Sequence, residues 1–228
     1  MLVDLVQNST EFIEEMILTL GPLGILMMAF LENMFPPTPS EVLYPLAGKL
    51  AFDGRISFIE VVIAGVLGSI LGALIWYALG FKLGDARIQS AINRYGKLRL
   101  IGVTITVVSV EEYNRGMHLF RQHGSIIVFV ARIMPLVHGV VSIPAGVVRM
   151  NLGTFLLFTA LGAAAWIAPL TWLGLWLGDN WEQLLRWIDI YENLWYLAMG
   201  LAIILYIVRR VYKTRSQLKI STDHNGDQ

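Results

Sequence analysis

Cysteine is absent from the 228 residues of this chain, which excludes disulfide bonds, zinc-thiolate sites and thiol nucleophiles. Charged residues are scarce, at 15%, and 17 lysines and arginines balance 17 aspartates and glutamates. A chain without a basic excess lacks the electrostatic footprint of a nucleic-acid binder, so we expect no nucleic-acid partner. The sequence also lacks a metal-ligand cluster, a phosphate-binding glycine loop and a dinucleotide fingerprint. We therefore expect no metal and no cofactor.

Hydrophobic residues, by contrast, make up 56% of the chain, and the mean hydropathy is +0.62. This composition is typical of an all-α integral membrane protein. At about 20 residues per crossing, the chain has room for a handful of spans and for no soluble catalytic domain. We predict a single membrane domain over residues 1–228, so any chemistry lies in or at the bilayer.

Three long apolar runs predict about three full transmembrane helices, at residues 59–81, 153–178 and 194–208. The segment 82–123 and the tail 209–228 are both rich in Lys and Arg, which places them in the cytoplasm by the positive-inside rule. The first twenty residues carry four acidic side chains and no basic one, the reverse of a signal peptide. We expect an outside N-terminus, an inside C-terminus and a multi-pass protein of a bacterial cytoplasmic (inner) membrane.

Two further apolar segments, near 16–52 and 125–148, are each interrupted by residues that end helices. Three prolines in four residues cannot continue a helix, so the simplest structure enters the membrane, breaks and returns. We predict a re-entrant segment at each place. Their interrupting residues are Pro36, Pro37, Pro39 and Ser40 in the first segment, and Arg132, Pro135, His138, Gly139, Pro144 and Gly146 in the second.

The two halves of the chain share short sequence patterns. Residues 79–85 resemble residues 173–179, and Ala-Gly at 47–48 matches Ala-Gly at 145–146. The positive-inside assignment makes the two re-entrant segments face opposite sides of the membrane. These features predict an inverted-topology repeat, in which broken helices usually meet around a binding site near the midplane.

Four ionisable residues lie inside the two interrupted segments: Glu32 and Glu41 in the first, Arg132 and His138 in the second. An unpaired charge in the membrane costs about 2.5–3.5 kcal/mol on insertion scales, so the acids and bases should approach one another. One interpretation is a proton-accepting site beside an anion-binding site, with Arg132 holding a phosphate group. The other is a static ion-pair lock. His138 is either a pH switch or a buried neutral side chain.

Three other polar residues also allow two interpretations. Ser40 and Ser142 are either nucleophiles or partners for nearby backbone groups. Arg149, at the exit of the second segment, either assists in phosphate binding or extends its charge toward the membrane interface.

The chain resembles the DedA family, also called the SNARE-associated Golgi or VTT-domain family. The resemblance covers residues 20–178 and rests on two motifs. These are Glu32-x3-Pro36-Pro37-x-Pro39-Ser40-Glu41 followed by Ala47-Gly48, and Phe129-x2-Arg132-x2-Pro135-x2-His138 with Pro144-Ala145-Gly146-x3-Met150.

This resemblance implies a lipid transporter with two opposed re-entrant loops, in which Glu32, Glu41 and Arg132 match essential residues. Bacterial members are implicated in returning undecaprenyl phosphate across the cytoplasmic membrane, and eukaryotic relatives scramble phospholipids. His138 stands where the family has a second essential arginine, so one permanent positive charge is missing. Binding of a phosphate is then either weaker or dependent on a protonated His138.

The sequence therefore predicts a translocase, not an enzyme, that moves undecaprenyl phosphate or another phosphorylated lipid and is driven by protons. Glu32 and Glu41 would exchange protons, while Arg132, His138 and Arg149 would bind the lipid phosphate. The alternatives are a passive phospholipid scramblase, an intramembrane lipid phosphatase and a membrane scaffold or small channel. Whether the protein forms a homo-oligomer is left open.

Overall fold

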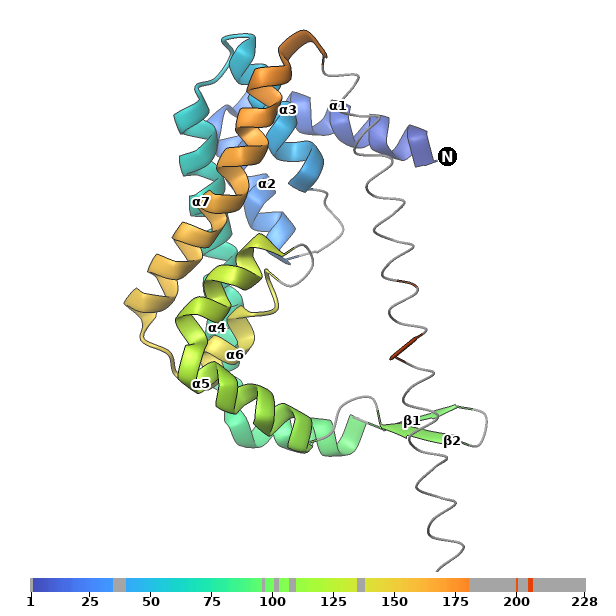
Figure 1. Ribbon diagram of the computed structural model, residues 1–228. Coiled ribbons are helices and arrows are strands. Elements are labelled where there is room, and N and C mark those ends of the chain that lie inside the picture. Colours follow the sequence, from blue (N-terminus) through green and yellow to red (C-terminus); the bar gives the residue numbers. More distant parts are fainter. Residues whose placement is uncertain are drawn as a thin grey trace, which may run out of the picture. The chain divides into compact units, whose positions relative to one another are not determined.

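The computed structural model describes residues 2–34, 40–95, 97–100, 103–106, 110–134, 138–180, 200 and 205–206. The chain divides into two compact units, one of residues 1–85 and 116–188, the other of residues 86–115 and 189–228. The elements are α1 (Leu2–Leu20), α2 (Pro22–Met34), α3 (Ser40–Phe52), α4 (Phe58–Tyr95), β1 (Lys97–Leu100), β2 (Val103–Thr106), α5 (Val110–Ile133), α6 (Ser142–Val147), α7 (Leu152–Leu177) and a 3-10 turn at Gly178–Asn180 (Figure 1).

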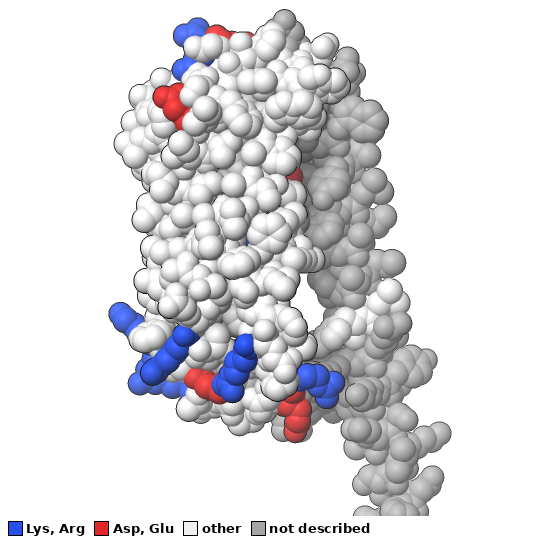
Figure 2. All heavy atoms as spheres, turned by 60° about the vertical axis from the view of Figure 1, so that its left-hand side comes forward, with Lys and Arg blue, Asp and Glu red and all other residues white. Residues whose placement is uncertain are grey.

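Two helices in the described ranges, α4 and α7, are long and apolar enough to cross a membrane. They contain the run 59–81 and all but the last residue of the run 153–178, so these two predicted spans are confirmed as helices of the required length and composition. The surface in Figure 2 is nearly free of charged side chains over a broad band, and charged side chains of both signs lie at the two ends of this band. The third predicted span, 194–208, lies almost entirely outside the described residues.

Helix α4 extends beyond the predicted span, which was expected to end at Phe81. The helix kinks at Gly84 and then continues to Tyr95. Gly84 has φ 66°, a backbone conformation that residues with a side chain rarely adopt. A kink at this glycine lets the helix change direction where the polar, basic segment begins.

The first interrupted segment differs from the prediction at its start. We expected one apolar helix from residue 16, but α1 ends at Leu20 and α2 begins at Pro22. Gly21 (φ 57°) ends α1, and Pro22 suits the first position of the next helix because its missing N–H would have no partner there. In Figure 1, α1 runs across the direction of α4 and α7. Helix α2 then ends at Met34 and α3 begins at Ser40, on either side of the proline motif.

The second segment also needs a correction. Helix α5 runs to Ile133 with a kink at His123 (φ −128°, ψ 23°), and a turn over residues 138–141 leads into α6. Pro144 and Gly146, which we expected to interrupt the segment, lie inside α6. Proline is tolerated there because it falls in the first turn of the helix, where its backbone nitrogen needs no partner.

A short antiparallel hairpin occupies part of the polar segment in the second unit. Its strands β1 and β2 pair Lys97 with Thr106 and Leu100 with Val103. We assigned this segment to the cytoplasm and did not predict strands in it. The alternation of Thr with Val and Ile in residues 103–106 is typical of a strand.

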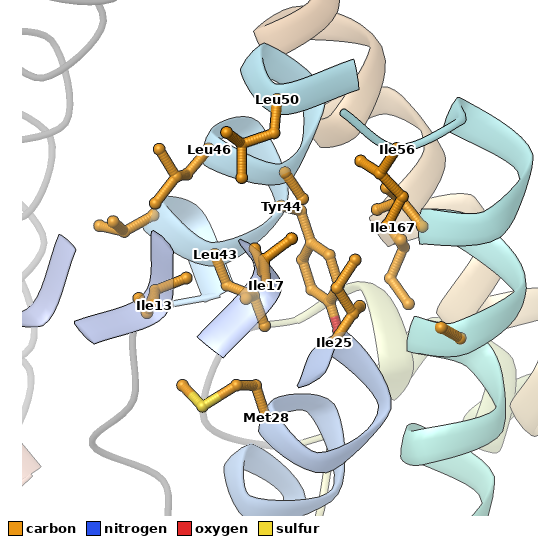
Figure 3. Close-up of a cluster of buried hydrophobic side chains, with 14 of the residues drawn as sticks. Ile13, Ile17, Ile25, Met28, Leu43, Tyr44, Leu46, Leu50, Ile56 and Ile167 are labelled. Atoms are coloured by element: carbon orange, nitrogen blue, oxygen red, sulfur yellow. The ribbon is translucent and has the colours of Figure 1, made fainter. Parts of the chain in front are cut away.

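The larger hydrophobic core of the first unit is formed by residues of α1, α2, α3, α4 and α7. Figure 3 shows Tyr44 of α3 in the middle of this cluster, near Ile17 and Ile25. A second core lies among α4, α5, α6 and α7 and includes Val128, Ala145 and Phe155. The two short helices α3 and α6 therefore each contribute buried residues to one of the two cores.

Glycines allow the short helices to touch the long ones at backbone distance. A Cβ on Gly48 of α3 would collide with the Thr171 carbonyl of α7, and one on Gly174 of α7 would collide with the Pro45 carbonyl. The contact recurs between α6 and α4, where a Cβ on Gly146 would meet the Tyr77 carbonyl and one on Gly80 the Ile143 carbonyl. Each short helix thus packs on a long helix from the other half of the sequence, through one glycine on each side.

Candidate functional site

Arg132 joins the two interrupted segments. It lies in the last turn of α5 and is buried, with 4% of its surface exposed. Its Nη1 donates a hydrogen bond to Asn33 Oδ1 (2.8 Å), and its Nη2 donates to Ser142 Oγ (3.1 Å). Because Asn33 lies in the last turn of α2 and Ser142 begins α6, one guanidinium holds three helix ends together.

The third nitrogen of this guanidinium, Nε of Arg132, is buried and has no hydrogen-bond partner among the described residues. Beside it lies a cavity of about 20 Å³ whose lining also includes Tyr44, Ser69 and Trp166. A buried N–H of an arginine without a partner is costly, so this donor is available for another acceptor in the cavity.

Glu32 lies opposite the arginine and next to the histidine. Its side chain is buried, its Oε1 is 3.7 Å from His138 Nε2, and its charge is close enough to attract that of Arg132. The structure thus brings together three of the four ionisable residues that the sequence predicted to meet. The carboxylate and the imidazole can pass a proton between them, while the guanidinium supplies a fixed positive charge beside them.

A second cavity, of about 60 Å³, is also lined by Glu32 and His138. Its remaining lining is mostly apolar and includes Met34, Trp76, Val140 and Ile143. Trp76 is fixed in this wall because its Nε1 donates to the backbone oxygen of Asn33 (2.8 Å). The charged cluster therefore borders a hydrocarbon-lined space, as a site for the polar end of an apolar molecule requires.

Sequence reasoning missed three residues of this site: Asn33, Tyr44 and Ser69. Asn33 is buried and uses its Nδ2 to bond Ala29 O (3.1 Å), its Oδ1 for Arg132 and its carbonyl for Trp76. Asn33 could have been predicted as a site residue, because it directly follows Glu32 in an apolar helix and an amide in the membrane also needs hydrogen-bond partners. The hydroxyls of Tyr44 and Ser69 carried no such signal.

The other residues predicted from the sequence, apart from Arg149, lie in α3 or α6 or beyond the described residues. Glu41 is half-buried in the first turn of α3 and lines neither of the two cavities. The hydroxyl of Ser142 accepts a hydrogen bond from Arg132. Ser40 is the first residue of α3. Pro144 and Gly146 support α6 against α4. Four prolines lie outside the described residues, namely Pro36, Pro37, Pro39 and Pro135.

Arg149 is exposed and has an unusual backbone. Its φ is 53°, and the hydrogen bonds Arg149 N to Gly146 O and Met150 N to Ala145 O close the end of α6 in a pattern that normally has glycine at this position. At the equivalent end of α3 that position is Gly54. The arginine side chain lies over the Phe81 ring, with Cζ 5.1 Å from the ring centroid. This contact with Phe81 offsets part of the cost of the left-handed backbone at Arg149.

This strain leads to a testable difference between two variants of Arg149. Both Arg149→Ala and Arg149→Gly lose the contact with Phe81, but only glycine accepts the positive φ without cost. We expect the glycine variant to be more stable by about 1 kcal/mol, measured by thermal unfolding in detergent. Equal stability of the two variants would contradict a left-handed backbone at this position.

Comparisons with known proteins give matches over most of the chain. A family model described as the VTT domain matches residues 38–175. A Lactococcus lactis protein named alkaline phosphatase-like protein is 32% identical over 219 residues, covering 93% of this chain and 99% of its own. The undecaprenyl phosphate transporter A of Staphylococcus aureus is 28% identical over 205 residues, covering 90% and 98%. The protein of the same name from Bacillus subtilis is 29% identical over 170 residues, covering 75% and 80%. No solved structure matches.

Proposed function

Since the chain belongs to the VTT-domain (DedA) family of membrane proteins, we propose that it transports a phosphorylated lipid, undecaprenyl phosphate, across the bacterial cytoplasmic membrane and that this transport is coupled to protons. The observation that carries this proposal is the buried cluster of Glu32, Arg132 and His138 beside an apolar cavity. The names of the Staphylococcus and Bacillus relatives support the same substrate.

The glycine contacts support an inverted-topology repeat with two opposed re-entrant segments. In each half, a short helix with an Ala-Gly pair packs on the long helix of the other half. The glycine of this pair contacts a carbonyl of the long helix, and three residues after that carbonyl the long helix has a glycine that contacts a carbonyl of the short helix. This equivalence holds for Thr171 and Gly174 on α7 and for Tyr77 and Gly80 on α4. Two halves related in this way can expose one central site to either side of the membrane.

Arg132 is the group that we assign to the lipid phosphate. Its two terminal nitrogens now bond to Asn33 and Ser142, neutral acceptors that a phosphate can displace because charged hydrogen bonds are stronger. Arg149, at the end of α6, would meet the headgroup on its way to or from the membrane surface.

Glu32 and His138 are the groups that we assign to proton coupling, with Glu41 as a second acid in the first segment. An anionic Glu32 beside Arg132 repels a phosphate and competes with it for the guanidinium. A proton on Glu32 removes that competition, and a proton on His138 adds a positive charge in place of the family's second arginine. Protonation from the outside therefore favours phosphate binding, and proton release inside favours its departure.

The test uses proteoliposomes that contain undecaprenyl phosphate and a phosphatase added outside that cannot cross the membrane. The wild-type protein should expose the inner lipid pool to the phosphatase, and an imposed proton gradient should speed this up several-fold. Glu32→Gln should remove the effect of the gradient, because glutamine cannot exchange a proton. Phosphate release from both leaflets is the measured quantity.

Glu60→Gln is the matched control, since Glu60 is exposed at the start of α4 and bonds only locally to Ser57 among the contacts described (2.8 Å to its N). It should behave as wild type. Exposure of the inner pool at the same rate with and without a gradient would point to a passive scramblase. Phosphate release without added phosphatase would identify the protein itself as a phosphatase, and an inner pool that stays protected would refute the substrate.

A further inference from the structure

Tyr44 has a polar group buried deep in the apolar core, outside the mechanism described above. Only 1% of its surface is exposed, and its neighbours in the core are Ile17, Ile25 and Ile167 (Figure 3). A hydroxyl in such surroundings needs partners. It has two, because hydrogen bonds join the Tyr44 hydroxyl to the side chains of Glu32 and Ser69.

The tyrosine ring is held in one place between two long helices. A Cβ added to Gly65 of α4 would lie 3.0 Å from Cε1 of Tyr44 and 3.0 Å from Cδ1 of Ile167, so glycine leaves only enough room for the ring. Ser69, one helical turn further along α4, is also buried and anchors the hydroxyl. Because the ring cannot move aside, the hydroxyl is a fixed donor to the Glu32 carboxylate.

We propose that Tyr44 is a positioning residue that holds the Glu32 carboxylate in the cluster and sets the pH range over which Glu32 takes up its proton. The inference rests on the proposed function, because proton uptake by Glu32 is the step that it controls. The same hydroxyl gives Glu32 a fixed orientation toward Arg132 and His138.

The charged and titratable groups that face Glu32 come from three elements besides its own. Arg132 of α5 favours the carboxylate by attraction, and His138, in the turn before α6, is 3.7 Å away. Tyr44 of α3 donates a hydrogen bond, which also favours the charged form. The fourth neighbour, Ser69 of α4, does not titrate. Replacing Tyr44 by phenylalanine leaves the arginine and the histidine in place, so any change in proton uptake reports the hydroxyl alone.

The experiment measures protonation of Glu32 directly. Dicyclohexylcarbodiimide, an apolar reagent, reacts with a carboxyl group in its protonated form, and mass spectrometry of the purified protein in detergent gives the labelled fraction of Glu32 at each pH. We expect the midpoint of labelling in Tyr44→Phe to lie at least about one pH unit above that of wild type, as for loss of one hydrogen bond to a charged group. Ser69→Ala should give a smaller shift in the same direction.

Tyr77→Phe is the matched control. Its hydroxyl donates to the backbone oxygen of Met150 (2.5 Å), so the same atom is removed from α4 without touching Glu32. It should leave the labelling midpoint unchanged. Identical labelling midpoints for Tyr44→Phe, Ser69→Ala and wild type would overturn the proposal. If Tyr44→Phe fails to insert into the membrane, an unchanged midpoint in Ser69→Ala is sufficient to overturn it.

The transport assay then separates this inference from the proposed function. If the pH profile of transport moves with the labelling midpoint in Tyr44→Phe, both stand. A labelling shift without a matching shift in transport would refute proton coupling through Glu32, while the role of Tyr44 toward Glu32 would remain. A wild-type protein that labels as expected but moves no lipid would refute the proposed function alone.

Discussion

Replacing Arg132 by alanine is expected to abolish transport and to destabilise the protein by about 3–5 kcal/mol, the usual cost of removing one partner from a buried charged pair. The size of the effect follows from the contacts of this residue. Its guanidinium supplies the hydrogen bonds of Asn33 and Ser142, and it is the permanent counter-charge of Glu32. Without it, three helix ends lose their common partner and a carboxylate is left in the membrane.

The alanine variant alone does not separate a structural role from phosphate binding, so Arg132→Lys is needed beside it. Lysine keeps the positive charge but cannot present two parallel donors to a phosphate. We expect this variant to reach the membrane at nearly the wild-type level and to lose most of its transport per inserted molecule. Wild-type transport by the lysine variant would contradict bidentate binding. Equal losses of protein level and transport in both variants would instead favour the static ion-pair lock.

The second large effect is expected at Gly48. In Gly48→Ala the new Cβ lies against the Thr171 carbonyl of α7, and backbone cannot give way as a side chain can. We expect a loss of about 3 kcal/mol, the upper end for overpacking, although alanine is the better helix former. Gly146→Ala should have a similar effect, because its Cβ meets the Tyr77 carbonyl. Thermal unfolding in detergent and the level of protein in the membrane measure both losses.

Gly116→Ala is the control that should change stability in the opposite direction. Gly116 lies in α5 with nothing within 4 Å of an added Cβ, so alanine should stabilise the helix by about 1 kcal/mol. If Gly48→Ala and Gly116→Ala were equally stable, close contact between α3 and α7 would be wrong.

The sequence was sufficient to predict the two spans of α4 and α7 and the meeting of Glu32, Arg132 and His138. Both predictions rest on large energies. A run of twenty apolar residues has few alternatives to a membrane helix, and a charge in that environment must find a counter-charge. This requirement holds however far apart the two charges lie in the sequence, so residues from the two halves of the chain could be predicted to approach one another.

Features controlled by smaller energies were not predicted. The hydroxyl of Tyr44 costs little to bury once it has a partner, so no pattern distinguishes it from other core tyrosines. The division of α1 from α2 depends on the single pair Gly21 and Pro22. Because apolar residues continue on both sides of this pair, the sequence was interpreted as one helix. Pro144 was taken as a helix breaker because its place in the first turn of α6 depends on where that short helix begins.

The packing of each short helix on the long helix of the other half has a consequence for synthesis. Helix α6 leaves the ribosome after α4, so its glycine contact can form as soon as α6 reaches the membrane. Helix α3 leaves long before α7 and must wait, with the backbone around Gly48 uncovered, until the later helix inserts. Translation that stops before α7 therefore leaves a nascent chain with an incomplete first half, a natural substrate for membrane chaperones and quality-control proteases.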